Sequence, residues 1–232
     1  MVRRDFDKSR YIIVGIITFL IFGLGITLGI IVTSAKVSSS ESLRKMQEID
    51  FKELQFQYLF MSTLEKSGSG CNVLRIALDK SVNDLAKSLK TLSSYKEKSM
   101  PTSDNEIRMI ERNYLLDNLK YWLFAQESKK TCNLDIVSIL YFYSEKNCPA
   151  CSDQGVILTY YKQLLQDKLL VFPINADLEE TDPIITILRS RYNITEYSSL
   201  VIEDETHSGV IQKDELEQLI CQRYKNKSTC YT

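Results

Sequence analysis

Residues 134–151 hold an apolar, β-branched and aromatic run that passes through a short polar loop into the motif Cys148-Pro149-Ala150-Cys151. A run of this length and composition predicts a buried strand, and the polar loop predicts where that strand ends. The two cysteines are therefore expected where a strand passes into a helix. Helical geometry then places the second cysteine within one turn of the first, which is close enough for a disulfide.

This placement favours dithiol–disulfide chemistry. The free N–H groups and the positive dipole end of the following helix stabilise a thiolate on the first cysteine. Cys148 is therefore the candidate catalytic nucleophile and Cys151 the candidate resolving thiol.

The two cysteines could also belong to a zinc site or form a purely structural disulfide. Half of a zinc site would need further ligands, but the chain contains no second C-x-x-C motif and no histidine besides His207. A purely structural disulfide would stay oxidised and unused. We therefore expect no bound metal, and the structural disulfide stays as the alternative.

The composition is typical of a globular chain of one or two domains, with 232 residues, 44% hydrophobic and 25% charged. A net charge of -1 gives no electrostatic reason to expect a nucleic-acid partner. The even number of cysteines, six, fits an oxidising compartment.

Residues 11–35, from Tyr11 to Ala35, contain no charged side chain at all. They predict a transmembrane signal anchor. A helix of about 25 residues is roughly 37 Å long, enough to cross a hydrocarbon core of about 30 Å. The basic residues before it predict a cytoplasmic tail at residues 1–10 and an extracytoplasmic location for the rest of a single-pass membrane protein. Cleavage of the anchor is an open alternative.

Residues 36–130 predict a helical stalk of about three helices. The first spans about 41–66 and ends at a Ser-Gly-Ser-Gly stretch, the second spans about 71–98, and the third ends near Lys129. The second helix has leucine and valine at alternating spacings of four and three, a pattern typical of helix–helix packing. No catalytic constellation is present here, so we expect a hairpin or stalk between membrane and catalytic domain.

The short turn between the second and third helices predicts that they are antiparallel. Cys71, at the start of one, should then lie beside Cys132, at the end of the other, and we expect a structural disulfide between them. A second structural disulfide, Cys221–Cys230, would fix the C-terminal tail. Four cysteines allow three connectivities, and free buried thiols are the alternative.

Residues 131–232 predict an α/β domain with a C-terminal tail. After the C-x-x-C motif we expect a helix at 152–167, a strand at 168–175, a helix at 183–192, a strand at 199–203, a turn at 204–208, a strand at 209–212 and a helix at 213–223. A right-handed crossover makes the first two strands parallel neighbours, and the final hairpin adds antiparallel pairing. The predicted fold is a four-stranded mixed sheet with flanking helices.

This order of elements, with C-x-x-C at the end of the first strand, resembles the thioredoxin-like family. The resemblance covers residues 131–224 and implies a membrane-anchored member of the family, in which Cys148 matches the exposed attacking cysteine and Cys151 the buried resolving one. Residues 192–201 are similar to the family's segment that ends in a cis-proline before the third strand, with Ser198 in the place of the proline. A non-proline cis bond costs about 3 kcal/mol, so we expect a trans bond or a rearranged loop.

The resemblance also implies a substrate groove formed by Pro149, Ala150, Ser198 and Ser199. The Pro-Ala dipeptide is neither the Gly-Pro of thioredoxins nor the Pro-His of strong oxidases, so we expect a reduction potential between those extremes. The first strand lacks the family's buried carboxylate. Glu145 is then either a poor substitute or a solvated loop residue.

Two asparagines outside the cysteine motifs have both a functional and a neutral interpretation. Asn193 and Asn226 match the glycosylation acceptor pattern, which is also frequent by chance. His207 is expected in a solvated turn.

The function expected from the sequence is that of a membrane-anchored, extracytoplasmic thiol–disulfide oxidoreductase. Its partners would be exported protein thiols or disulfides and a membrane redox protein, and no bound cofactor is needed. The alternative is a non-catalytic thioredoxin-like interaction or scaffold module that carries a structural disulfide.

Overall fold

The computed structural model describes residues 12–27, 68–97 and 104–230. The chain divides into two compact units, residues 1–63 and residues 64–232. Within the first unit, residues 12–27 are helical. The predicted helix at 41–66 lies outside the described residues.

The predicted membrane anchor at 11–35 is wrong. None of the helices in the described residues combines the length and the apolar character that a membrane crossing requires. The single-pass, extracytoplasmic localisation was inferred from that anchor and is corrected with it. The cytoplasmic tail predicted at 1–10 lies outside the described residues.

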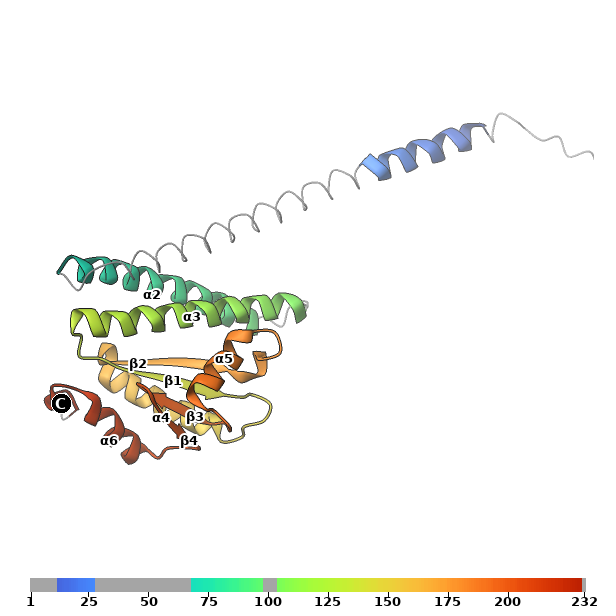
Figure 1. Cartoon of the computed structure of the whole chain (residues 1–232). Coiled ribbons are helices and arrows are strands. Elements are labelled where there is room, and N and C mark those ends of the chain that lie inside the picture. The colour runs from blue at the N-terminus through green and yellow to red at the C-terminus, as the bar shows by residue number, and fades with distance from the viewer. Residues whose placement is uncertain (1–11, 28–67, 98–103, 231–232) are drawn as a thin grey trace, which may run out of the picture. The chain divides into compact units, whose positions relative to one another are not determined.

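The second unit contains a four-stranded mixed sheet with the strand order β2-β1-β3-β4 (Figure 1). The strands are β1 (Val137–Tyr143), β2 (Leu169–Asn175), β3 (Ser199–Ile202) and β4 (Glu205–Ser208). Strands β1 and β2 are parallel, with Tyr143 opposite Asn175, whereas β3 is antiparallel to both β1 and β4. The carboxyl ends of β1 and β2 therefore meet at one end of the sheet.

Helices cover both faces of this sheet (Figure 1). The helices after β1 are α4 (Cys151–Leu165), α5 (Pro183–Tyr192) and α6 (Lys213–Arg223), and short 3-10 turns lie at Gln166–Lys168, Ala176–Leu178 and Lys227–Cys230. One apolar cluster joins Ile139 of β1 to Leu158 of α4 and Leu216 of α6. A second cluster joins Phe142 of β1 to Ile185 of α5. Because β1 is buried on both faces, its sequence is apolar without alternation.

Helices α2 (Gly68–Glu97) and α3 (Asp104–Cys132) form an antiparallel hairpin. Three contacts between the helices show this direction, because their residue numbers rise along α2 and fall along α3. They are the Cys71–Cys132 disulfide, the Asp84–Lys120 ion pair at 2.7 Å and the Tyr95–Glu106 hydrogen bond at 3.1 Å. Helix α2 begins at Gly68, three residues before the predicted start.

Helix α3 also covers the edge of the sheet at β2. The side-chain amide of Asn118, which is 1% exposed, donates a hydrogen bond of 2.9 Å to the carbonyl of Pro173 in β2. Leu115 and Leu119 of the same helix belong to the second apolar cluster. Helix α3 thus packs against the sheet and provides a hydrogen-bond donor for one backbone carbonyl of β2.

The predicted boundaries of the final β-hairpin are wrong. The turn consists of Glu203 and Asp204, and β4 occupies 205–208, so His207 lies in the strand opposite Leu200 instead of in a turn. Glu203 has a left-handed backbone with φ of 58°. Its side chain accepts a hydrogen bond of 2.9 Å from the N–H of Ser138 and pairs with Lys129 at 2.8 Å. These long-range contacts stabilise a turn that has no Asn-Gly or similar signal.

The C-terminal segment is fixed to the start of β1. Cys221 and Cys230 form a disulfide, and the backbone N–H groups of Lys225 and Asn226 donate to the Asp135 carboxylate at 2.9 and 3.1 Å. Both disulfide pairings, this one and Cys71–Cys132, are those expected from the sequence.

Candidate functional site

The C-x-x-C motif connects the loop after β1 to the first turn of α4. Cys148 and Cys151 form a disulfide with a Cα–Cα distance of 5.4 Å. Cys148 is partly buried against the first apolar cluster, whereas Cys151 is only 6% exposed. Pro149 and Ala150 between them are exposed. The two sulfurs are therefore inequivalent, and Cys148 is the one nearer to solvent.

The start of α4 supplies a positive electrostatic environment at this motif. Ala150 is the N-cap residue and no side chain caps the helix. The N–H of Cys151 donates to the carbonyl of Cys148 at 3.2 Å, and the N–H of Gln154 donates to the carbonyl of Ala150 at 3.4 Å. Because the helix dipole is positive at this end, it favours negative charge on a sulfur placed there.

Tyr141 supports the buried cysteine from within the sheet. Its hydroxyl donates a hydrogen bond to the carbonyl of Cys151, and its ring stacks on Tyr143 with centroids 5.4 Å apart. Burial raises the pKa of Tyr141 above its ordinary value, so the hydroxyl stays protonated and remains a donor near neutral pH. The sequence analysis missed this role because a tyrosine in a buried strand has no feature that separates it from other core residues.

Asp177 holds the loop that precedes Cys148. Its carboxylate accepts a hydrogen bond from the hydroxyl of Ser144 at 2.6 Å and from the N–H groups of Glu145 and Lys146 at 2.9 and 3.2 Å. The sequence analysis also missed Asp177. The available signal was its place just after the second parallel strand, because the carboxyl ends of parallel neighbours meet.

The segment before β3 lies at the same end of the sheet. Ser199 is opposite Phe142 in the register of β1 and β3, and its hydroxyl donates to the carbonyl of Glu196 at 2.7 Å. The carbonyl of Ser198 accepts a hydrogen bond from the N–H of Gly209 at 2.7 Å. The Tyr197–Ser198 peptide bond is cis, so the expected trans bond is wrong.

The four predicted groove residues differ in exposure. Pro149 and Ala150 are exposed, but Ser198 and Ser199 are 1% and 0% exposed. Tyr197, which precedes the two serines, is partly exposed and packs against both apolar clusters. The Arg189 guanidinium lies 5.5 Å from the centroid of the Tyr197 ring. In this segment Tyr197, and not the two serines, reaches the surface.

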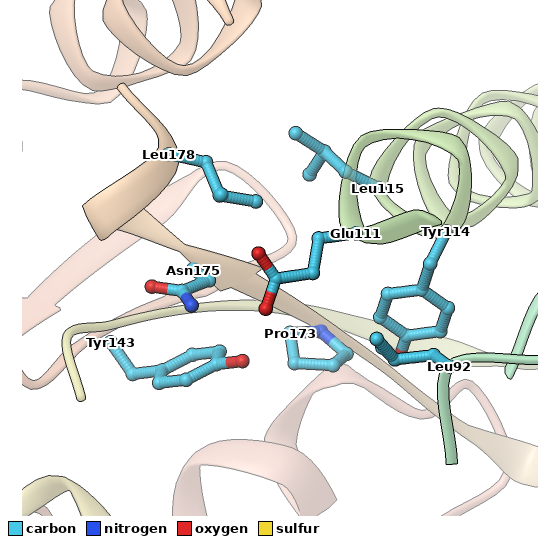
Figure 2. A pocket seen from close by; sticks show the side chains of 8 residues that line it. All are labelled: Leu92, Glu111, Tyr114, Leu115, Tyr143, Pro173, Asn175 and Leu178. Atoms are coloured by element: carbon cyan, nitrogen blue, oxygen red, sulfur yellow. The ribbon is translucent and has the colours of Figure 1, made fainter. Parts of the chain in front are cut away.

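A small cavity lies beside the loop, between the helical hairpin and the carboxyl ends of β1 and β2 (Figure 2). Its volume is about 30 Å³, which is room for about two water molecules. In Figure 2 the carboxylate of Glu111 points toward Asn175 and toward the ring of Tyr143. Burial raises the pKa of Tyr143 above its ordinary value, and the negative charge of Glu145 acts in the same direction.

The structure also places the remaining predicted site residues. The Cys71–Cys132 disulfide is at the end of α3 that precedes β1, and Cys221–Cys230 is in the tail. Asn193 ends α5 with a left-handed backbone, and Asn226 is exposed, so both asparagines lie on the surface. Glu145 is exposed in the loop. Within the described ranges no group of three or more His, Cys, Asp or Glu side chains is arranged to hold a metal ion.

Comparisons with known proteins add little to this geometry. No family model matches the chain, and no curated protein matches it. A solved structure described as "Structure of a malarial protein" is similar to 38% of this chain over 97% of its own length, with 16% identity and a TM-score of 0.32.

Proposed function

We propose that the protein is a thiol–disulfide oxidoreductase of thioredoxin-like architecture that acts through Cys148 and Cys151. The observation that carries the proposal is the asymmetry of the pair at the strand-to-helix junction. Cys148 is partly exposed beside an uncapped helix start, and Cys151 is 6% exposed behind it. The strand order, with α4 and α6 packed on one face of the sheet and α5 on the other, supports the architecture.

In the reductive direction, the Cys148 thiolate attacks one sulfur of a client disulfide. A mixed disulfide forms between Cys148 and the client, and the other client sulfur leaves as a thiolate that takes up a proton. Cys151, after losing its proton, then attacks the sulfur of Cys148 and releases the second client thiolate. Two electrons and two protons pass to the client, and the protein is left with the Cys148–Cys151 disulfide. The oxidative direction is the reverse of these steps.

The partners required by this chemistry are client proteins with thiols or disulfides and a second redox protein that restores the starting state. The sulfur atoms themselves carry the electrons, so the exchange needs no bound cofactor. Exposed Pro149 and Ala150, together with Tyr197, form the surface that a client segment would contact.

The second candidate function is a scaffold with three structural disulfides. The observation in its favour is the helical hairpin, because α2 and α3 contribute no residue to the disulfide between Cys148 and Cys151, yet they make up a large part of the described chain. Such a protein would use its helices to bind another protein.

The deciding experiment is the redox equilibrium of Cys148 and Cys151 in the full chain, measured in glutathione buffers by alkylation and mass spectrometry. The Cys221→Ser/Cys230→Ser variant is the matched control, because it removes a disulfide but leaves the motif intact. A reversible couple between about -120 and -270 mV in both proteins supports the oxidoreductase. A pair that stays oxidised below about -300 mV supports the scaffold.

The Cys151→Ser variant provides an independent measurement. Without the resolving thiol, a mixed disulfide on Cys148 cannot be released by internal attack. We expect a disulfide-containing client such as oxidised insulin to remain attached to Cys148 in this variant and not in Cys148→Ser. Equal capture by the two variants would contradict the assigned roles.

A further inference from the structure

The loop of residues 144–147 is held by two side chains. The hydroxyl of Ser144, which is 1% exposed, accepts hydrogen bonds from the N–H groups of Lys146 and Asn147 at 3.2 and 2.9 Å. The Asp177 carboxylate accepts from the Ser144 hydroxyl and from the N–H groups of Glu145 and Lys146. All three backbone donors directly before Cys148 are therefore bound by Ser144 and Asp177.

Asp177 is itself fixed to the sheet. Its N–H donates a hydrogen bond of 3.0 Å to the side-chain oxygen of Asn175, the last residue of β2. Asn175 lies opposite Tyr143, the last residue of β1. The Asp177 side chain therefore connects the loop before Cys148 to the C-terminal end of the neighbouring strand β2.

We propose that Asp177 is a positioning residue for the dithiol pair, which keeps Cys148 facing Cys151 when the disulfide is reduced. This inference rests on the proposed oxidoreductase function. Once the S–S bond is broken, only noncovalent contacts order the loop. Two reacting groups held in place react as if at a very high concentration, and loosening one of them lowers that concentration.

The ionised side chain matters because hydrogen bonds to a charged acceptor are about twice as strong as neutral ones. Asp177→Asn keeps the shape of the side chain but replaces one accepting oxygen with a donor group, so it loses part of the network. Asp177→Ala loses all of it. We therefore expect graded effects on the reactions of the two cysteines.

The chain offers a matched control in Asp135. Its carboxylate also accepts hydrogen bonds from two backbone N–H groups, those of Lys225 and Asn226. Asp135 precedes β1 and so lies at the opposite end of the sheet from Cys148. Asp135→Ala removes a comparable set of bonds without touching the cysteine loop.

The experiment uses glutathione as the probe and the full chain. The first readout is the equilibrium constant between the reduced protein with glutathione disulfide and the oxidised protein with two glutathione thiols. The second is the rate at which Cys151 displaces glutathione from a mixed disulfide on Cys148. Urea unfolding of each oxidised variant measures stability separately.

We expect Asp177→Ala to lower both the equilibrium constant for disulfide formation and the displacement rate by about tenfold, the effect of losing a charged hydrogen-bond acceptor. For Asp177→Asn, both the equilibrium constant and the displacement rate should lie between those of this variant and of the wild type. Asp135→Ala should change each quantity less than about twofold, while its stability falls by an amount similar to that of Asp177→Ala. Equal redox effects of Asp177→Ala and Asp135→Ala, or none in either, would overturn the proposal.

If Asp177→Ala does not fold, Ser144→Ala provides the same test, because it removes the hydroxyl that bridges Asp177 to Lys146 and Asn147. The two proposals fail in different ways. The absolute potential of the wild type decides whether the pair is an exchanging couple or a structural disulfide. The equilibrium constant and the displacement rate of each variant, relative to those of the wild type, decide whether Asp177 positions the pair.

Discussion

The hydroxyl of Tyr141 donates a hydrogen bond to the backbone carbonyl of Cys151, and this contact ties the middle of β1 to the first residue of α4. The donor is 6% exposed, and so is the residue that accepts the bond. The resolving cysteine is therefore held through its backbone by the sheet, while Cys148 depends on the loop before it.

Replacing Tyr141 with phenylalanine tests this tie. The ring and its stacking on Tyr143 are retained, but the carbonyl of Cys151 loses its donor. We expect the free energy of unfolding to fall by about 1 to 2 kcal/mol in urea titrations. Tyr160→Phe is the control, because Tyr160 is 45% exposed, and it should change stability by less than about 0.5 kcal/mol. A Tyr141→Phe protein as stable as the control would mean that the contact is not stabilising.

The two disulfides outside the candidate site should differ in their effect on stability. The Cys71–Cys132 bond closes a separation of 61 residues and Cys221–Cys230 one of 9. A longer closed loop removes more entropy from the unfolded chain, which gives about 4 kcal/mol for the first and about 2.5 kcal/mol for the second. Paired Cys→Ser variants, compared by urea unfolding, should show this order. The reverse order would show that native contacts and not loop closure determine the difference.

The ion pair between Arg112 and Asp182 should stabilise the contact of α3 with the start of α5. The Arg112 Nε atom lies 2.7 Å from an oxygen of Asp182, whose side chain is 2% exposed. Arg112→Met leaves a buried carboxylate without its cation, and we expect a loss of about 2 kcal/mol. Adding Asp182→Asn to that variant should restore part of the loss. Arg223→Met is the control and should cost less, because its partner Glu205 has a side chain 58% exposed.

Alkaline pH should destabilise the protein through its buried tyrosines. Burial raises the pKa of Tyr143 and of Tyr224 above the ordinary value of 10.0. Above that value the unfolded chain loses phenolic protons that the folded chain retains. The stabilisation is therefore fully present below about pH 10 and is lost as the pH rises further. Unfolding free energies measured between about pH 8 and pH 11 should show this decline, which should be shallower in Tyr224→Phe.

Local patterns in the sequence predicted the core of the second unit. The unbroken apolar run of β1 and the C-x-x-C motif are each contained in one short segment, so β1 and α4 were predicted with small errors at their ends, and the bounds of α6 were predicted correctly. The Cys71–Cys132 pairing followed from two helices of similar length joined by a short turn. For the three elements neighbouring residues decide the structure, and the disulfide follows from the connection of two helices.

The features that the sequence analysis missed depend on contacts between distant segments. Asp177 acts on a loop more than 30 positions before it, and the turn at Glu203 is stabilised by Lys129 and Ser138. The predicted membrane anchor was wrong as well, since no helix in the described residues meets the requirements for crossing a membrane.

The Cys71–Cys132 disulfide also decides where helix α2 begins relative to the sheet. It joins the first turn of α2 to the residue that ends α3, a few positions before β1 begins, whereas Cys148 follows the other end of that strand. The start of α2 therefore lies at the far end of the sheet from the candidate site. The disulfide and the cysteine motif are thus held at opposite ends of one strand, β1.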